Sequence, residues 1–103
     1  MNLFINDKQA LLKQLHNHRD EIKKFGVKNL GLFGSFVKDT ANKESDIDLL
    51  IDFHKDKKTF DNFINLSFYL EEIFNRKVEI VTPQSLSKYF GHHILNEVEY
   101  VAL

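Results

Sequence analysis

Residues 46–53, Asp-Ile-Asp-Leu-Leu-Ile-Asp-Phe, constrain the fold of this chain more than any other stretch. Apolar side chains occupy every second position from Ile47 to Phe53, and they alternate with Asp46, Asp48, Leu50 and Asp52. Successive side chains of a β-strand point to opposite faces, so this period of two predicts a strand with one buried face. Asp46 and Asp48 then project together from the other face, with Cα atoms roughly 6.5–7 Å apart.

Two carboxylates that project together repel each other unless a cation lies between them. Mg²⁺ prefers carboxylate and phosphate oxygens, and a site of this kind can hold two ions about 3.5–4 Å apart. The residues alone leave a simpler alternative, a solvated strand face, because Asp-x-Asp is a short and common pattern.

Apolar periodicity and turn residues predict five further elements around this strand. They are a helix capped by Asn6 or Asp7 and ended by Gly26, a strand at 30–33, a helix capped by Thr59 and reaching Phe74, a strand at 77–82, and a helix from Pro83 to about Val98 that is either continuous or broken near Gly91. This order predicts an α/β or α+β fold with a small mixed sheet flanked by helices, as a single domain over residues 1–103.

The charge balance argues against a nucleic-acid-coating role. Fourteen Lys and Arg nearly cancel fifteen Asp and Glu, so the chain lacks the broad basic surface that gives non-specific phosphate affinity. Cysteine is absent, which excludes disulfides and thiolate chemistry. The sequence contains neither a signal peptide nor an apolar run of about 18 residues, so we expect a cytoplasmic protein without membrane contact.

Gly34-Ser35 falls where the 30–33 strand ends. Glycine allows a phosphate to approach the main chain, and a serine hydroxyl with backbone N–H groups at the start of a helical turn forms an anion site. Gly-Ser alone is usually a turn. Followed by a polar loop of about ten residues and then the Asp46–Asp48 pair, it is a far more specific arrangement.

Gly31-Leu32-Phe33-Gly34-Ser35-Phe36, followed by Ser45-Asp46-Ile47-Asp48-Leu49-Leu50-Ile51, resembles the signature of the DNA-polymerase-β-like nucleotidyltransferase superfamily. The resemblance is to the minimal nucleotidyltransferases of prokaryotes, and it implies their fold and site. It assigns triphosphate binding to Gly34 and Ser35, with Lys38 contributing positive charge. It assigns catalysis and the binding of two Mg²⁺ ions to Asp46, Asp48 and a third acid, for which Glu79 is the candidate on the 77–82 strand.

The sequence departs from the family pattern at two places. The family commonly has Asp where this chain has Glu79, and many relatives have Ala-Arg-Gly where this chain has Val37-Lys38-Asp39. Lys38 keeps the positive charge but lacks the bidentate fork of arginine. Asp39 adds a negative charge near the expected phosphates, so the changes at Lys38 and Asp39 bear on nucleotide affinity. Glu79 is longer than Asp by one methylene, so either the metal geometry adjusts or activity is weakened.

The resemblance implies transfer of AMP from ATP to an acceptor hydroxyl. It further implies an antitoxin role, in which the acceptor is a tyrosine of a cognate HEPN toxin, a small helical ribonuclease, in a hetero-oligomer. A homodimer also stays open. The alternatives are a binding module that neutralises its partner by complex formation, and an enzyme that modifies a small molecule held by a separate helical subunit. Arg76 and Lys77 either reach the nucleotide or acceptor, or are solvated.

Overall fold

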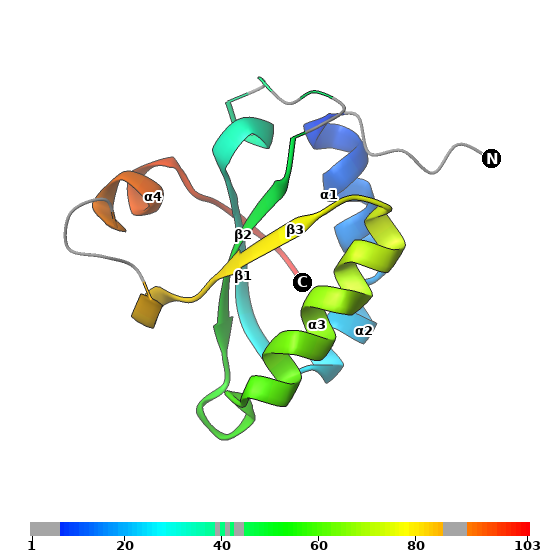
Figure 1. The fold of residues 1–103 in the computed structure, drawn as a ribbon, viewed down its shortest axis with the longest axis vertical. Coiled ribbons are helices and arrows are strands. Elements are labelled where there is room, and N and C mark those ends of the chain that lie inside the picture. Colours follow the sequence, from blue (N-terminus) through cyan, green and yellow to red (C-terminus); the bar gives the residue numbers. More distant parts are fainter. Residues whose placement is uncertain (1–6, 39, 41, 43–44, 86–90) are drawn as a thin grey trace.

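Four strands form one mixed sheet in the order β3-β2-β1-β4 (Figure 1). The structure is a computed structural model, and it describes residues 7–38, 40, 42, 45–85 and 91–103. β1 pairs antiparallel with both β2 and β4, whereas β2 and β3 run parallel. The strands are β1 (Val27–Phe33), β2 (Ile47–Phe53), β3 (Val78–Val81) and β4 (Glu99–Val101).

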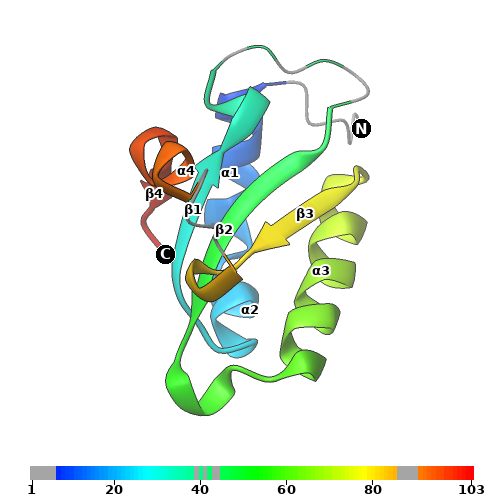
Figure 2. The same cartoon turned by 60° about the vertical axis from the view of Figure 1, so that its left-hand side comes forward.

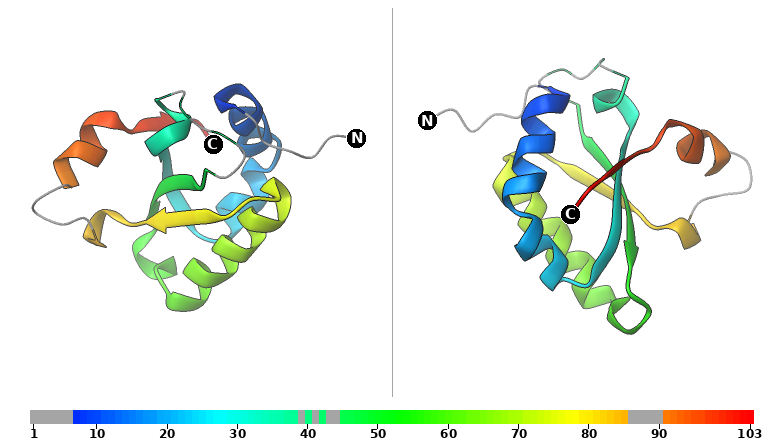
Figure 3. Two further views of the ribbon diagram at one scale, coloured as in Figure 1. Left: turned by 45° about the horizontal axis from the view of Figure 1, so that its top comes forward. Right: turned by 180° about the vertical axis from the view of Figure 1, so that it is seen from behind.

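Three helices cover one face of this sheet, and a fourth lies on the other side (Figures 2 and 3). The first three are α1 (Lys8–Asn17), α2 (Arg19–Lys24) and α3 (Phe60–Phe74), and the fourth is α4 (Gly91–Glu97). The core lies between the sheet and the first three helices. It includes Leu11, Leu15, Ile22, Ile47, Leu49, Ile51, Leu66, Leu70 and Phe74. This arrangement confirms the predicted small mixed sheet flanked by helices.

The two predicted helix caps are present. Asp7 accepts a hydrogen bond from the Ala10 amide at 2.9 Å, and Thr59 accepts one from the Asn62 amide at 3.1 Å. Each side chain therefore satisfies a backbone donor that a helix start would otherwise leave unpaired. α3 ends at Phe74, and the next residue, Asn75, adopts the left-handed conformation with φ 52°.

The N-terminal helix is divided in two, unlike the single helix predicted from the sequence. His18 leaves the helical conformation between α1 and α2, with φ −107° and ψ 14°. Its ring Nδ1 lies 3.0 Å from the Tyr69 hydroxyl of α3, so the break accompanies a contact between helices. A local apolar pattern does not contain this contact, because Tyr69 is distant in the sequence.

The C-terminal quarter also differs from the predicted helix between Pro83 and about Val98. Pro83–Ser85 forms only a short 3₁₀ turn. The Ser85 hydroxyl donates a hydrogen bond to the Thr82 carbonyl at 2.9 Å and accepts one from the Thr82 amide at 3.1 Å. The helix then covers only Gly91–Glu97, and the chain ends in β4, a strand that the sequence pattern did not predict. No helix within the described residues is long and apolar enough to cross a membrane.

Candidate active site

The Gly-Ser turn follows β1 directly, in the 3₁₀ turn η1 (Gly34–Phe36). Gly34 has a φ of 78°, a conformation that other residues rarely adopt. A Cβ at this position would collide with the Asp48 carboxyl group, with its Cγ at 3.1 Å and its Cβ at 3.3 Å. Glycine is therefore required here both for its backbone conformation and for the close approach of an acidic side chain.

Asp48 has two acidic neighbours, Asp46 and Glu79, and we call these three residues the acidic cluster. The Cα of Asp48 pairs with Phe33 in β1 on one side and with Glu79 in β3 on the other. Asp46 immediately precedes β2, where the sequence pattern had placed it as the first strand residue. Because Ile47 and Leu49 are fully buried toward the helices, the aspartates project from the opposite face. Glu79 is exposed beside them.

The electrostatics of this cluster favour a cation. Partial burial, which has the largest effect, and the negative charges of Glu79 and Asp46 together raise the pKa of Asp48 from its ordinary value of 3.8 to about 6. The carboxylate form is thus disfavoured in the protein alone. A positive charge near Asp48 would remove this penalty.

The donor atoms suit Mg²⁺, although the three acids do not all gather around one point. Among the residues that the structure describes, no three His, Asp or Glu side chains lie close enough to hold one ion together. Mg²⁺ is commonly held by one or two carboxylates, with phosphate oxygens and waters completing its shell. Asp46 and Asp48 meet that requirement, and the Gly-Ser turn lies directly beside Asp48.

Of the other two residues assigned to nucleotide binding, Ser35 lies within the turn and Lys38 follows it by two residues. Ser35 is half-buried, and its carbonyl accepts a hydrogen bond from the Thr40 amide at 2.9 Å. The Lys38 ammonium lies 3.1 Å from the Glu97 carboxylate of α4. Lys38 is therefore near the turn, but in this structure its charge is paired with an acid. Asp39 lies outside the described residues.

Arg76 makes contacts that the sequence did not predict. Its guanidinium donates hydrogen bonds to the carbonyl oxygens of Asn42 at 2.6 Å and Ser45 at 2.7 Å, and lies 5.3 Å from the centre of the Phe36 ring. The sequence offered nucleotide or acceptor contact, or solvation, for this side chain. The structure directs it to the loop before Asp46.

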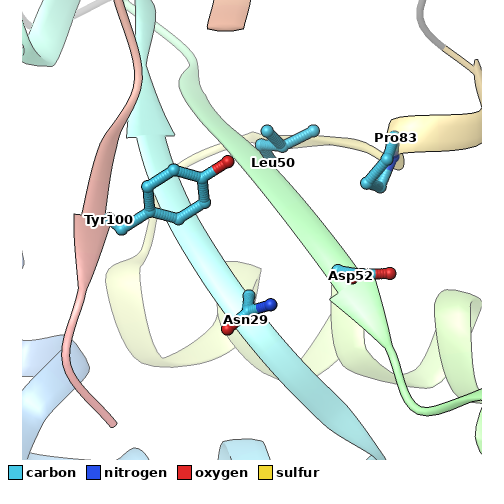
Figure 4. A pocket seen from close by; sticks show the side chains of 5 residues that line it. All are labelled: Asn29, Leu50, Asp52, Pro83 and Tyr100. Carbon is cyan, nitrogen blue, oxygen red and sulfur yellow. The ribbon is translucent and has the colours of Figure 1, made fainter.

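A small cavity of about 50 Å³ lies farther along the same face of the sheet (Figure 4). The Tyr100 ring lies over β1 here (Figure 4). It is close to Gly31, since a Cβ on that residue would lie 3.4 Å from the Cδ1 atom of the ring. The cavity is lined by Asn29, Leu50, Asp52, Pro83 and Tyr100. Asp52 shares a strand face with Asp48 but is four residues away along β2. It therefore lies outside the acidic cluster and serves as a control position for changes at Asp48.

The family model of the nucleotidyltransferase domain matches residues 15–101 of this chain. The chain therefore belongs to the nucleotidyltransferase-domain family, and it is a nucleotidyltransferase that uses a nucleotide substrate. It is 38% identical over 85 residues to the protein adenylyltransferase MntA of Thermococcus cleftensis, an alignment that covers 82% of this chain and 85% of that protein.

Solved structures resemble this fold. One is provisionally described as a minimal nucleotidyltransferase, with a TM-score of 0.79 and 25% identity over 90% of this chain and 94% of that one. Another is a toxin–antitoxin structure with AMP-PNP, which matches 90% of this chain and 70% of that chain with a TM-score of 0.65. Its 22% identity supports a shared fold.

Proposed function

We propose that this chain transfers AMP from ATP to a tyrosine hydroxyl of a cognate HEPN-family toxin, and that this modification is its antitoxin activity. The observation that carries the proposal is the close approach of the Asp48 carboxyl group to Gly34, which brings an acidic side chain to the Gly-Ser turn. Two similarities support the choice of acceptor: a relative is named a protein adenylyltransferase, and a structure of similar fold is a toxin–antitoxin with AMP-PNP.

In the proposed reaction, the tyrosine oxygen forms a bond to the α-phosphorus, and the bond from that phosphorus to the bridging oxygen breaks as pyrophosphate leaves. Gly34 and Ser35 would hold the triphosphate through backbone N–H groups and the serine hydroxyl. The exposed Glu79 carboxylate would accept the tyrosine proton. Two Mg²⁺ ions held by Asp46 and Asp48 would supply positive charge to the attacking and leaving oxygens.

A labelling experiment tests this proposal. The purified chain is incubated with Mg²⁺, ATP labelled at the α-phosphate, and the product of the neighbouring gene. We expect label on a tyrosine of that product, loss of label with Asp48→Asn, and retention with Asp52→Asn, the matched change on the same strand. Label that persists in Asp48→Asn would contradict the assigned role of this residue.

A binding module that neutralises its partner without chemistry is the second candidate. The specific observation in its favour is that Glu79 is not gathered with the two aspartates in the described residues. Calorimetry separates the two functions. An enzyme binds ATP in the presence of Mg²⁺, whereas the binding module retains partner affinity and gives no heat with the nucleotide.

A further inference from the structure

Arg76 occupies the turn between α3 and β3, three residues before Glu79. Two hydrogen bonds hold the backbone that follows it. The Lys77 carbonyl accepts a hydrogen bond from the Ile47 amide at 2.9 Å, and the Glu71 carboxylate of α3 accepts one from the Val78 amide at 3.0 Å. The start of β3 is therefore held to both the start of β2 and the preceding helix.

The side chain of Arg76 extends from this fixed point to the loop that leads into Asp46. This loop ends in a closed turn, in which the Ser45 amide donates to the Asn42 carbonyl at 3.1 Å and the Asn42 amide donates to the Ser45 hydroxyl at 2.9 Å. The guanidinium donates to the carbonyl oxygens at both ends of the turn. Charged donors form stronger hydrogen bonds than neutral ones, so these two contacts hold the residue before Asp46 in place.

The same guanidinium also contacts the Gly-Ser turn. It lies 5.3 Å from the centre of the Phe36 ring, which is 1% exposed at the end of η1. A half-buried cation over an aromatic ring is an attractive contact. One side chain thus touches the segment that follows Gly34 and Ser35 and the segment that precedes Asp46, while its own strand carries Glu79.

We propose that Arg76 is a positioning residue, which sets the distance between the phosphate-binding turn and the acids on β2 and β3. This inference rests on the proposed function for its consequence in catalysis. It assigns Arg76 to the loop backbone and not to the nucleotide. Removing the guanidinium leaves the acids in the chain but releases their spacing, so metal affinity falls while the fold survives.

The test compares Arg76→Gln and Arg76→Lys with wild type. Arg19→Gln is a matched control, because Arg19 also donates to a backbone carbonyl, that of His16 at 2.9 Å, on the helical side of the molecule. The first measurement is amide hydrogen exchange of Ser45 and Ile47 in the metal-free protein. Local opening should increase exchange there by about tenfold or more in Arg76→Gln, and not in Arg19→Gln.

The second measurement is the affinity for Mn²⁺, followed by electron paramagnetic resonance of the free ion. Loss of a residue that orients ligands typically lowers metal affinity by about 10–100-fold, which we expect for Arg76→Gln. Arg76→Lys should retain part of the Mn²⁺ affinity that Arg76→Gln loses, because lysine supplies the charge but not the two-pronged donor geometry of arginine. With ATP present, turnover should fall more than the KM for ATP rises, since the proposal assigns the arginine to the loop backbone and not to nucleotide binding.

Unchanged exchange in Arg76→Gln would overturn the proposal, and so would faster exchange with unchanged Mn²⁺ affinity, which is the behaviour of a purely structural contact. Failure of the wild-type protein to bind either Mn²⁺ or nucleotide would instead refute the proposed function. In that case the exchange data would still decide whether Arg76 holds the loop.

Discussion

Gly34 stands where β1 passes into η1, with a φ of 78° and the Asp48 carboxyl group beside its α-carbon. Gly26 offers a comparison within the same chain. It also has a positive φ, of 91°, and a Cβ there would collide with the side chain of Lys57. The two glycines thus face similar steric limits, but only Gly34 adjoins the acidic cluster.

Replacing Gly34 with alanine separates these two roles. We expect Gly34→Ala and Gly26→Ala each to lower the free energy of unfolding by about 1–2 kcal/mol, the usual cost of a left-handed conformation for a residue with a Cβ. Urea denaturation measures this loss. Labelling of the acceptor should fall about a hundredfold in Gly34→Ala alone, because a shifted carboxylate misplaces the reacting groups. An equal fall in Gly26→Ala would attribute the effect to lost folded protein.

Asp48 should make the metal-free protein less stable as the pH rises. Its folded-state pKa, about 6, lies above its ordinary 3.8, so the folded protein binds the proton more tightly than the unfolded chain. Stability therefore falls as pH rises between about 4 and about 6, and the penalty is fully present above that range.

Asp48→Asn removes this penalty because asparagine resembles the neutral carboxyl group. Solvent screening of a half-buried group reduces the expected gain to about 1 kcal/mol at neutral pH, and the gain should vanish below about pH 4. The measurement is the urea midpoint at both pH values in the presence of a chelator. Asp52→Asn is the control, and a gain in Asp48→Asn that does not depend on pH would contradict the electrostatic explanation.

At the scale of elements, the sequence predicts the helices and strands that are determined by residues close together in the chain. The alternation in β2 is visible in the buried Ile47, Leu49 and Ile51, and the caps Asp7 and Thr59 mark helix starts through contacts three residues away. The proximity of Gly34 to the acids was likewise predictable from the motif, because adjacent strand ends bring the two segments together.

The remaining elements depend on contacts between distant parts of the chain. β4 is only three residues long, and it is defined by its pairing with Leu30, Gly31 and Leu32 of β1. The ion pair between Lys8 and Glu99 adds a contact with α1. The hydrogen bonds of Arg76 span 31 and 34 residues. No window of local sequence contains such information, which explains why the sequence pattern predicted neither the strand nor the contacts of this arginine.

At the scale of the whole molecule, the sheet divides two functions between its faces. One face packs against α1, α2 and α3 and supplies the apolar core, whereas the other carries Asp48 and the cavity beside Tyr100 (Figures 2 and 4). A chain of 103 residues can bury only a small core and has limited stability. Binding at the acidic face should therefore change the stability of the entire fold measurably.

Nucleotide and metal together should raise the unfolding temperature of this protein more than either alone. A ligand at about 100 times its Kd adds about 2.7 kcal/mol to the free energy of unfolding, which in a chain of this size corresponds to a shift of about 11–20 °C. ATP with a chelator should give a much smaller shift, because the phosphates then meet the unneutralised charges of Asp46, Asp48 and Glu79. The shift should disappear in Asp48→Asn and persist in Asp52→Asn. Equal shifts with and without Mg²⁺ would place the nucleotide away from the acids, since only a site that shares the ion couples the two ligands to one folding equilibrium.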